Sequence, residues 1–215
     1  MSYIVPEEIE AYASAHTTSP EELLAELAEE TKATLRWPEM LTGPIEGRLL
    51  ELLVHGLGAK RVLELGTYSG YSALSMAAGL AEGGHIDTCE VDETHAEVAR
   101  RYIARSPYAD RITVHLGPAL ETIERLGGEF DFVFIDADKE DYGAQYDALL
   151  PRLAPHGLMA IDNTLWSGRV LDEAADDSVD TRAIRELNDR IANDERAVVV
   201  QLTVRDGVTL IRRAG

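Results

Sequence analysis

Short apolar runs alternate with helix-like segments along most of this chain, and this alternation is the feature that most restricts its fold. Five runs are nearly continuous in apolar residues, as in strands buried on both faces: 61–65, 85–91, 111–116, 131–136 and 157–162. Helices are expected between them, over about 70–80, 93–105, 118–126 and 141–153. Such β–α alternation predicts a parallel sheet with right-handed crossovers and helices on both faces.

The end of the chain departs from this alternation. AVVVQLTV and VTLIRR are two strand-like runs separated by Arg205, Asp206 and Gly207, and Asp-Gly is a hairpin signal. The hairpin should contribute one antiparallel strand, at the edge of the sheet or inside it. We therefore predict an α/β, Rossmann-like fold with a mostly parallel sheet of seven strands.

Helices are also expected before the sheet. In SPEELLAEL, Ser19 is predicted to be the N-cap, Pro20 the first helical residue and Glu22 the partner in a capping box. A second helix is expected over about 43–58, leading into the first strand.

The chain is predicted to form one domain. Its 215 residues, 45% of them hydrophobic, suffice for a full core, and no linker or repeat divides them. Within this domain we interpret residues 1–58 as a helical lid region over the carboxyl edge of the sheet, and 59–215 as the Rossmann-like core.

Composition excludes several classes of partner. The sequence has no long apolar run and no secretory signal, and it contains a single cysteine, Cys89, so a cytoplasmic protein without membrane spans is expected. A net charge of −19 would repel a phosphate backbone, which argues against nucleic acid. The same charge suits a cationic ligand or a divalent metal.

VLELGTYSGYSAL follows a predicted strand and opens a helix, where Gly66 and Gly70 allow a tight turn facing a ligand. The G-x-G-x-x-G fingerprint of dinucleotide sites is absent, because Glu64 precedes Gly66 by two residues. This acid would repel a pyrophosphate but suits a ligand with ammonium and sulfonium groups. Glu90, at the end of the next strand, can bind both ribose hydroxyls. Together these features indicate S-adenosylmethionine (SAM); the alternative is a pair of ordinary turn glycines.

The loop after the third strand borders the same crevice. Pro118 and Ala119 in LGPALETI are small and apolar, which suits stacking on the adenine ring. An ordinary helix start with proline in its first turn explains Pro118 equally well.

Two further predicted strands end on acids, Asp136 and Asp162, and Asn163 follows directly. Neighbouring strands are about 4.8 Å apart, so both carboxylates can reach one point. Two close carboxylates repel each other unless a cation or a proton lies between them. Two carboxylates and an amide oxygen favour a hard cation, with Mg²⁺ first and Mn²⁺ or Ca²⁺ as alternatives. Helix capping or a turn is the competing explanation.

Lys139 lies three residues after Asp136, in the loop at the mouth of the sheet. Beside a divalent cation its ammonium form is disfavoured, so Lys139 is a candidate for the base that removes a hydroxyl proton. A surface lysine paired with Asp138 or Asp141 is the alternative.

These motifs, with MLTGP, CEVD, GPAL, FIDADKEDY and IDNTLWSGRV, resemble the cation-dependent O-methyltransferases related to catechol and caffeoyl-CoA O-methyltransferases, from about residue 20 to the end. The resemblance implies that Asp136, Asp162 and Asn163 bind the metal and that Lys139 is the catalytic base, with Asp136 beside it. The residues then expected to contact SAM are Met40, Thr42, Glu64, Gly66, Thr67, Tyr68, Ser72, Glu90, Pro118, Ala119, Asp136 and Asp138. The family is usually dimeric, so a homodimer is expected.

The implied reaction is methyl transfer from SAM to one hydroxyl of a catechol-like molecule. The loop 163–180 should frame this small phenolic acceptor, with Trp166 as a wall for the ring and Arg169 as an anchor for a carboxylate of the acceptor. Packing of Trp166 into its own loop is an equal alternative. A coenzyme A ester is disfavoured, because the only basic residues in the first sixty positions are Lys32, Arg36, Arg48 and Lys60.

Two other functions remain open at this stage. The DAD sequence after a strand would suit a metal-dependent phosphohydrolase with Asp136 as its nucleophile, but this leaves Glu64 and Glu90 unexplained. The other alternative is a protein that binds SAM as a sensor or partner without catalysis.

Overall fold

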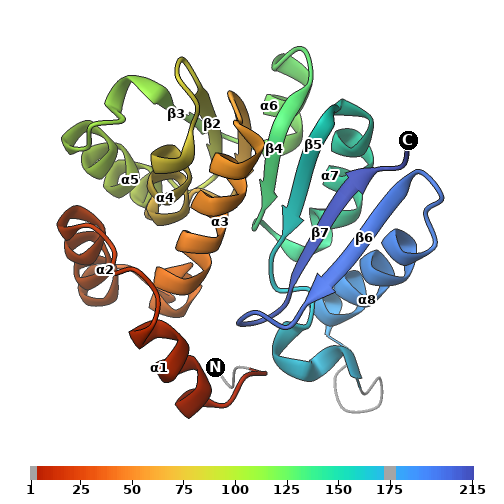
Figure 1. Cartoon of the computed structure of the whole chain (residues 1–215), viewed down its shortest axis with the longest axis horizontal. Coiled ribbons are helices and arrows are strands. Elements are labelled where there is room, and N and C mark those ends of the chain that lie inside the picture. Colours follow the sequence, from red (N-terminus) through yellow and green to blue (C-terminus); the bar gives the residue numbers. More distant parts are fainter. Residues whose placement is uncertain (1–3, 172–177) are drawn as a thin grey trace.

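The computed structural model describes residues 4–171 and 178–215. Its core is a seven-stranded sheet with the order β3-β2-β1-β4-β5-β7-β6 (Figure 1). The strands are β1 (Arg61–Leu65), β2 (His85–Glu90), β3 (Ile112–Leu116), β4 (Phe130–Ile135), β5 (Leu153–Ile161), β6 (Ala197–Leu202) and β7 (Val208–Arg213). Strands β1 to β5 pair in parallel, whereas β7 is antiparallel to both β5 and β6. The predicted fold class is confirmed, and the antiparallel strand lies inside the sheet.

Helices cover both faces of the sheet (Figure 1). The α-helices are α1 (Glu7–Ala15), α2 (Glu22–Thr34), α3 (Gly43–Leu57), α4 (Tyr71–Gly79), α5 (Glu93–Arg105), α6 (Ala119–Arg125), α7 (Tyr142–Leu149) and α8 (Val179–Ala192). Short 3₁₀ helices are η1 (Pro38–Met40), η2 (Ala109–Arg111), η3 (Lys139–Asp141), η4 (Leu150–Arg152) and η5 (Trp166–Leu171). No helix in these described segments is both long and apolar enough to span a membrane.

The alternation of side chains along the strands divides the core into two clusters. In β4, Phe132 and Phe134 join the cluster that α2, α3, α4 and α5 cover, whereas Val133 and Ile135 join the cluster under α6, α7 and α8. Because both faces of the central strands are covered, these strands need apolar residues at every position, which explains the continuous runs in the sequence.

The start of α2 differs from the prediction. The helix begins at Glu22, preceded by Glu21 without a side-chain cap, so the prediction of Ser19 as N-cap was wrong. The carbonyl of Ser19 instead accepts a hydrogen bond of 3.1 Å from the guanidinium of Arg48 on α3. This tertiary contact holds the chain before the helix against α3, and local capping rules do not include such contacts.

Other helix boundaries also differ from expectation. Helix α7 ends at Leu149 and is followed by η4, because Pro151 has no backbone N–H to continue an α-helix. Neither α1 nor α8 is among the helices predicted from the alternation. Helix α8 has a detectable signal, since Ser178 caps it by accepting from the backbone N–H of Thr181.

The parallel strands end at one edge, where the order of connection reverses between β1 and β4. In such sheets the ligand crevice lies beyond the carboxyl ends of the strands at this point. Helix α1, the start of α3, the β6–β7 turn and η5 also lie at this edge (Figure 1). The predicted lid role of residues 1–58 remains a prediction, but the edge is where such a lid would act.

Candidate active site

The turn after β1 requires its glycines. Gly66 has a φ of 99°, and a Cβ atom there would lie 2.0 Å from the backbone oxygen of Asp136. Gly70 has a φ of 89°, and its Cβ would lie 3.1 Å from the Cβ of Ala99 on α5. The backbone N–H groups of Gly66 and Thr67 both donate to the carbonyl of Cys89, at 3.0 Å. The turn is therefore pressed between β2, β4 and α5, and it opens α4 toward the crevice.

Glu64 is a fully buried acid on β1 at the same edge. Its Oε2 accepts a hydrogen bond of 2.5 Å from the hydroxyl of Thr88, whereas Oε1 has no hydrogen-bond partner within the described chain. Burial raises the pKa of Glu64 to about 8, although hydrogen bonds from Ser72 and Thr88 act in the opposite direction. A cation facing Oε1 would favour the ionised form, as expected for a SAM ligand.

Glu90 is held rigidly at the end of β2. Its Oε2 accepts from the backbone N–H of Tyr68 at 2.7 Å, and Oε1 accepts from those of Val91 and Asp92 at 2.9 Å each. A carboxylate has about four acceptor sites, so hydrogen-bonding capacity remains for ribose hydroxyls. Three backbone donors thus orient the acid that is predicted to bind the ribose.

Tyr68 connects the glycine turn after β1 to the N-terminal region. Its hydroxyl donates to the carbonyl oxygens of Arg36 and Trp37, at 2.9 and 3.2 Å. These residues lead into η1, which ends at the half-exposed Met40, while Thr42 is buried before α3. The predicted contacts from Met40 and Thr42 therefore lie on a segment tied to the glycine turn.

The loop before α6 is joined to the same edge. Gly117 donates its backbone N–H to the carbonyl of Glu90 at 2.8 Å. Pro118 is the N-cap of α6, and Ala119 is its first residue, so the helix start predicted there is present. The loop lies next to the strand end that carries Glu90, the placement expected of an adenine contact.

The two strand-end aspartates are adjacent. Strands β4 and β5 pair Ile135 with Ile161, so Asp136 and Asp162 follow at the same level. Asp162 is buried, and its pKa is raised to about 7, first by burial and then by the negative charge of Asp136. Asn163 donates to Asp162 from its backbone N–H at 2.7 Å and from Nδ2 at 3.1 Å. The amide oxygen of Asn163 therefore remains available to bind a cation.

Lys139 in η3 lies beside this pair. Its Nζ is 3.0 Å from Oδ1 of Asp136 and 2.6 Å from the hydroxyl of Tyr142, the first residue of α7. The same ammonium lies 5.8 Å from the centre of the Trp166 ring. The structure therefore brings together Lys139, Asp136 and Trp166, which the sequence analysis placed in one site.

The segment that carries Trp166 is anchored to the β6–β7 turn. The N–H of Ser167 donates to the carboxylate of Asp206, and the N–H of Leu165 donates to the backbone oxygen of Asp206 at 3.0 Å. The exposed Arg169 stacks its guanidinium 4.7 Å from the centre of the Trp166 ring. Part of the predicted acceptor loop, residues 172–177, lies outside the described residues.

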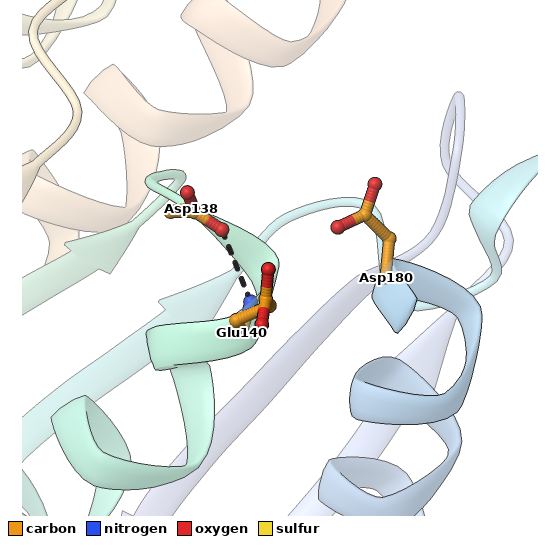
Figure 2. A group of neighbouring side chains, drawn as sticks. All are labelled: Asp138, Glu140 and Asp180. Carbon is orange, nitrogen blue, oxygen red and sulfur yellow. Dashed lines mark hydrogen bonds between the residues drawn. The ribbon is translucent and has the colours of Figure 1, made fainter. Parts of the chain in front are cut away.

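A second group of acids lies outside this site. Figure 2 shows Asp138 just before η3, Glu140 within η3 and Asp180 at the start of α8. One ligand oxygen of each lies within 4.8 Å of those of the other two. Asp138 and Glu140 are exposed, and Oδ1 of Asp138 accepts from the N–H of Glu140 at 3.2 Å, so Asp138 caps η3. The contact with SAM expected of Asp138 remains a prediction.

Comparison with known proteins identifies the family. A family model described as O-methyltransferase matches residues 13–214, which is nearly the whole chain. The chain belongs to this O-methyltransferase family. Caffeoyl-CoA O-methyltransferase 2 of Zea mays is 37% identical over 213 residues, covering 93% of this chain and 79% of the maize protein. A probable caffeoyl-CoA O-methyltransferase 1 of Dictyostelium discoideum is 33% identical, covering 94% and 90% of the two chains.

Solved structures agree with this assignment. An O-methyltransferase from Bacillus cereus in complex with SAH has a TM-score of 0.86 and 31% identity, covering 96% of this chain and 97% of its own. TomG from Streptomyces achromogenes, an O-methyltransferase of tomaymycin synthesis crystallised with SAM, has a TM-score of 0.86 and 27% identity, with 97% and 96% of the chains covered. The protein is therefore a SAM-dependent O-methyltransferase of the caffeoyl-CoA type, rather than a phosphohydrolase or a non-catalytic sensor.

The O-methyltransferase site contains an acid that sequence reasoning missed. Glu46 on α3 is 1% exposed, and its Oε2 lies 3.8 Å from Nε of Arg205 in the β6–β7 turn. Burial raises its pKa well above the usual value, and the charge of Asp162 adds to this effect. Its spacing from Gly43, Leu50 and the rest of the buried face of α3 was the available signal.

The residues present fit a divalent cation. Asp136, Asp162 and the amide oxygen of Asn163 are hard oxygen donors on neighbouring loops. The pKa of Asp162 is raised because this carboxyl is buried and lies beside the negative charge of Asp136, and a cation between the two would relieve both effects.

Proposed function

We propose that this O-methyltransferase transfers the methyl group of SAM to one hydroxyl of a catechol-like acceptor and that it depends on a divalent cation. The observation that carries the proposal is the buried Asp162 beside Asp136, with Lys139 3.0 Å from Asp136. Asp136, Asp162 and Asn163 would hold the cation, with Mg²⁺ as the first expectation. A bound divalent cation would supply Lewis-acid chemistry that lowers the pKa of a phenolic hydroxyl.

The protein's own residues then have distinct roles. Lys139 accepts the proton of the reacting hydroxyl, and Asp136 and Tyr142 fix the position of its Nζ. Glu64 faces the cationic part of SAM, and Glu90 binds the ribose. Trp166 forms a wall beside the acceptor ring. Much of the acceleration comes from holding the phenol oxygen in line with the methyl carbon and sulfur.

The charge of a cavity beside the start of α3 supports a small acceptor without phosphates. A cavity of about 420 Å³ lies between α1, α2, η1 and α3, with Arg205 at one side. Among the described residues, its charged lining consists of three acids, Glu7, Glu10 and Glu39, and two basic residues, Lys32 and Arg205. Lys32 also pairs with Glu29 at 2.8 Å. The phosphates of a coenzyme A ester would be repelled here. We therefore propose a free catechol as the substrate class, although relatives are named for caffeoyl-CoA.

Labelled SAM provides the test. The full chain is incubated with catechol, caffeic acid or caffeoyl-CoA, in Mg²⁺ or in EDTA, and methylated products are counted. Transfer to the free catechols in Mg²⁺ and loss of transfer in EDTA are expected. Transfer that persists in EDTA would refute the metal mechanism, and transfer to caffeoyl-CoA alone would refute the proposed acceptor.

Asp162→Ala is the matched variant for this assay. It removes a proposed metal ligand but none of the residues of the glycine turn after β1, so turnover should be lost while SAH binding, measured by calorimetry, is largely retained. Loss of both would contradict separate cation and SAM sites. We further propose that the protein is a cytoplasmic homodimer. Light scattering after gel filtration measures its molar mass and so tests the dimer.

A further inference from the structure

The loop after β5 has an unusual backbone. Asn163, Trp166 and Ser167 have φ values of 58°, 46° and 54°, in the left-handed region that residues with a side chain rarely adopt. Gly168 follows with a φ of 80°. Consecutive left-handed residues are unfavourable by themselves and persist only where surrounding contacts hold them. Contacts from outside the loop must therefore stabilise this conformation.

The β6–β7 turn provides such contacts. The backbone N–H of Thr164 donates to the carbonyl of Gly207 at 3.0 Å. The N–H of Leu165 donates to the carbonyl of Asp206, also at 3.0 Å. The N–H of Ser167 donates to Oδ1 of the Asp206 side chain. Of these three contacts, the one made by the Asp206 side chain reaches a left-handed residue directly.

Asp206 is placed differently from an ordinary hairpin aspartate. In turns, the side chain of aspartate usually hydrogen-bonds its own backbone about two residues further on. Here the carboxylate is 5% exposed and binds Ser167, 39 positions earlier in the chain. Its Oδ2 has no hydrogen-bond partner within residues 4–171 and 178–215. The side chain therefore serves the loop after β5 as well as the turn in which it lies.

The position of the Trp166 ring depends on this contact. The ring centre lies 5.8 Å from Nζ of Lys139 and 4.7 Å from the guanidinium of Arg169. Ser167 directly follows Trp166, and both residues are left-handed. Without the hydrogen bond to Asp206, the backbone at Ser167 could relax to a more favourable conformation, and the ring of the preceding residue would move with it.

We propose that Asp206 is a positioning residue of the acceptor site, which holds Ser167 so that the Trp166 ring stays in place as the wall for the acceptor ring. This inference rests on the proposed function, because it takes Trp166 as that wall. Asp206 acts through a backbone hydrogen bond and from a distant part of the chain. The β6–β7 turn thereby shapes the acceptor site as well as closing the hairpin.

The first test compares two variants of the full chain in the methylation assay with catechol. Asp206→Ala removes the acceptor of the Ser167 N–H, so the KM for catechol should rise about tenfold, the upper range for loss of an aromatic contact. The wall contacts the ring before and during the reaction, so kcat should change much less than KM. Asp206→Asn keeps an oxygen that can accept the same hydrogen bond, so its KM should equal that of the wild type. An unchanged KM in Asp206→Ala, or an equal rise in both variants, would overturn the inference.

The second test follows the ring itself and needs no acceptor. The chain has two tryptophans, Trp37 and Trp166, so in a Trp37→Phe background the emission comes from Trp166 alone. Because Nε1 of Trp166 is buried, Asp206→Ala should shift this emission to longer wavelength and increase its quenching by acrylamide, whereas Asp206→Asn should not. Unchanged emission in Asp206→Ala would overturn the inference alone. A shift in a protein that methylates no catechol would refute the proposed function and the role of Trp166 in it.

Asp194→Ala is the matched control. Oδ1 of Asp194 also accepts from a backbone N–H, that of Arg196 at 2.9 Å, but it lies after α8 and away from the site. This variant should melt at a lower temperature without any change in KM or in Trp166 emission. A purely structural role of Asp206 predicts the same pattern for Asp206→Ala, and that result would overturn the inference.

Amide hydrogen exchange of the wild-type protein gives a measurement that does not depend on the folding of a variant. The N–H of Ser167 should be protected from exchange, although it lies in a loop, because the carboxylate of Asp206 accepts it. Exchange of this N–H at the rate of an exposed loop would overturn the inference.

Discussion

The ammonium of Lys139 donates a hydrogen bond of 2.6 Å to the hydroxyl of Tyr142, whose ring is fully buried at the start of α7. The ammonium also lies 4.7 Å from the centre of this ring. Tyr142 at the start of α7 and Asp136 at the end of β4 therefore hold the proposed base between them.

Tyr142→Phe should separate this positioning from folding. The ring is kept, but the lysine loses a partner, which costs about 1.5–3 kcal/mol of stability for a hydrogen bond to a charged group. We expect kcat to fall about tenfold, which corresponds to about 1.4 kcal/mol, with SAH affinity unchanged. Tyr146→Phe is the control, because its hydroxyl bonds Asp194 at 2.9 Å, away from the site. It should lose stability without losing kcat.

Lys139→Ala should lower turnover by about 10²- to 10⁴-fold, the usual contribution of a general base. The loss should be greatest at low pH, because a free phenol ionises without help only as the pH approaches about 10. The pH profile of kcat checks this expectation, with Lys60→Ala as a control for the loss of a lysine outside the site. A loss that does not vary with pH would remove Lys139 as the base.

SAM binding should release a proton from Glu64. Burial raises the pKa of this acid to about 8, so most of it is protonated at pH 7 in the free protein. A cationic ligand favours the carboxylate, so SAM affinity should increase as the pH rises from 6 to 8. Calorimetry in two buffers of different ionisation enthalpy measures the released proton. In Glu64→Gln the release should vanish, and an unchanged release would show that another group supplies it.

The metal-free protein should be less stable at pH 8 than at pH 5.5. The pKa of Asp162 is raised to about 7 and that of Glu64 to about 8, so in this range the folded state binds more protons than the unfolded state. Stability then falls as the pH rises. The acids with lowered pKa values, such as Asp92 and Asp131, lose their contribution only below this window.

Melting temperatures in EDTA at the two pH values measure this effect. For a chain of this size, about 1 kcal/mol corresponds to about 2–4 °C. Asp162→Asn should reduce the difference, and so should saturating Mg²⁺, because the cation replaces the proton between the carboxylates. Equal melting temperatures at both pH values would contradict the burial of these acids as described.

Gly66→Ala should be far more harmful than Gly83→Ala. Both positions have positive φ values, 99° and 72°, which cost a side chain about 1–2 kcal/mol. At Gly83 a new Cβ meets nothing within 4 Å in the described structure, whereas at Gly66 it would lie 2.0 Å from the oxygen of Asp136. We expect Gly66→Ala to cost at least about 3 kcal/mol and to abolish SAH binding. Denaturant unfolding of both variants gives the comparison, and similar losses would contradict the close contact.

The sequence alone was sufficient to predict the sheet and the residues that follow the ends of its strands. Continuous apolar runs identified β1 to β5, and Asp-Gly identified the hairpin of β6 and β7. Parallel strands share a carboxyl edge, so residues just after them, such as Glu90, Asp136 and Asp162, are neighbours in any fold with adjacent strands. Local patterns are informative here because one periodic element determines where each of these residues lies.

The tertiary structure alone decided what surrounds those residues. Glu46 is near Asp162 because the start of α3 lies at the carboxyl edge of the sheet, and Arg205 is near Glu46 because the β6–β7 turn lies at the same edge (Figure 1). Likewise, α2 begins at Glu22 rather than directly after Ser19, whose carbonyl accepts a hydrogen bond from Arg48 on α3. These contacts join segments far apart in the sequence, and they depend on helix packing and side-chain direction, which no local periodicity encodes. The sequence by itself therefore determined the fold and the positions of the acids at the strand ends. Tertiary packing decided how far the pKa values of these acids are shifted and which charged residues lie beside them.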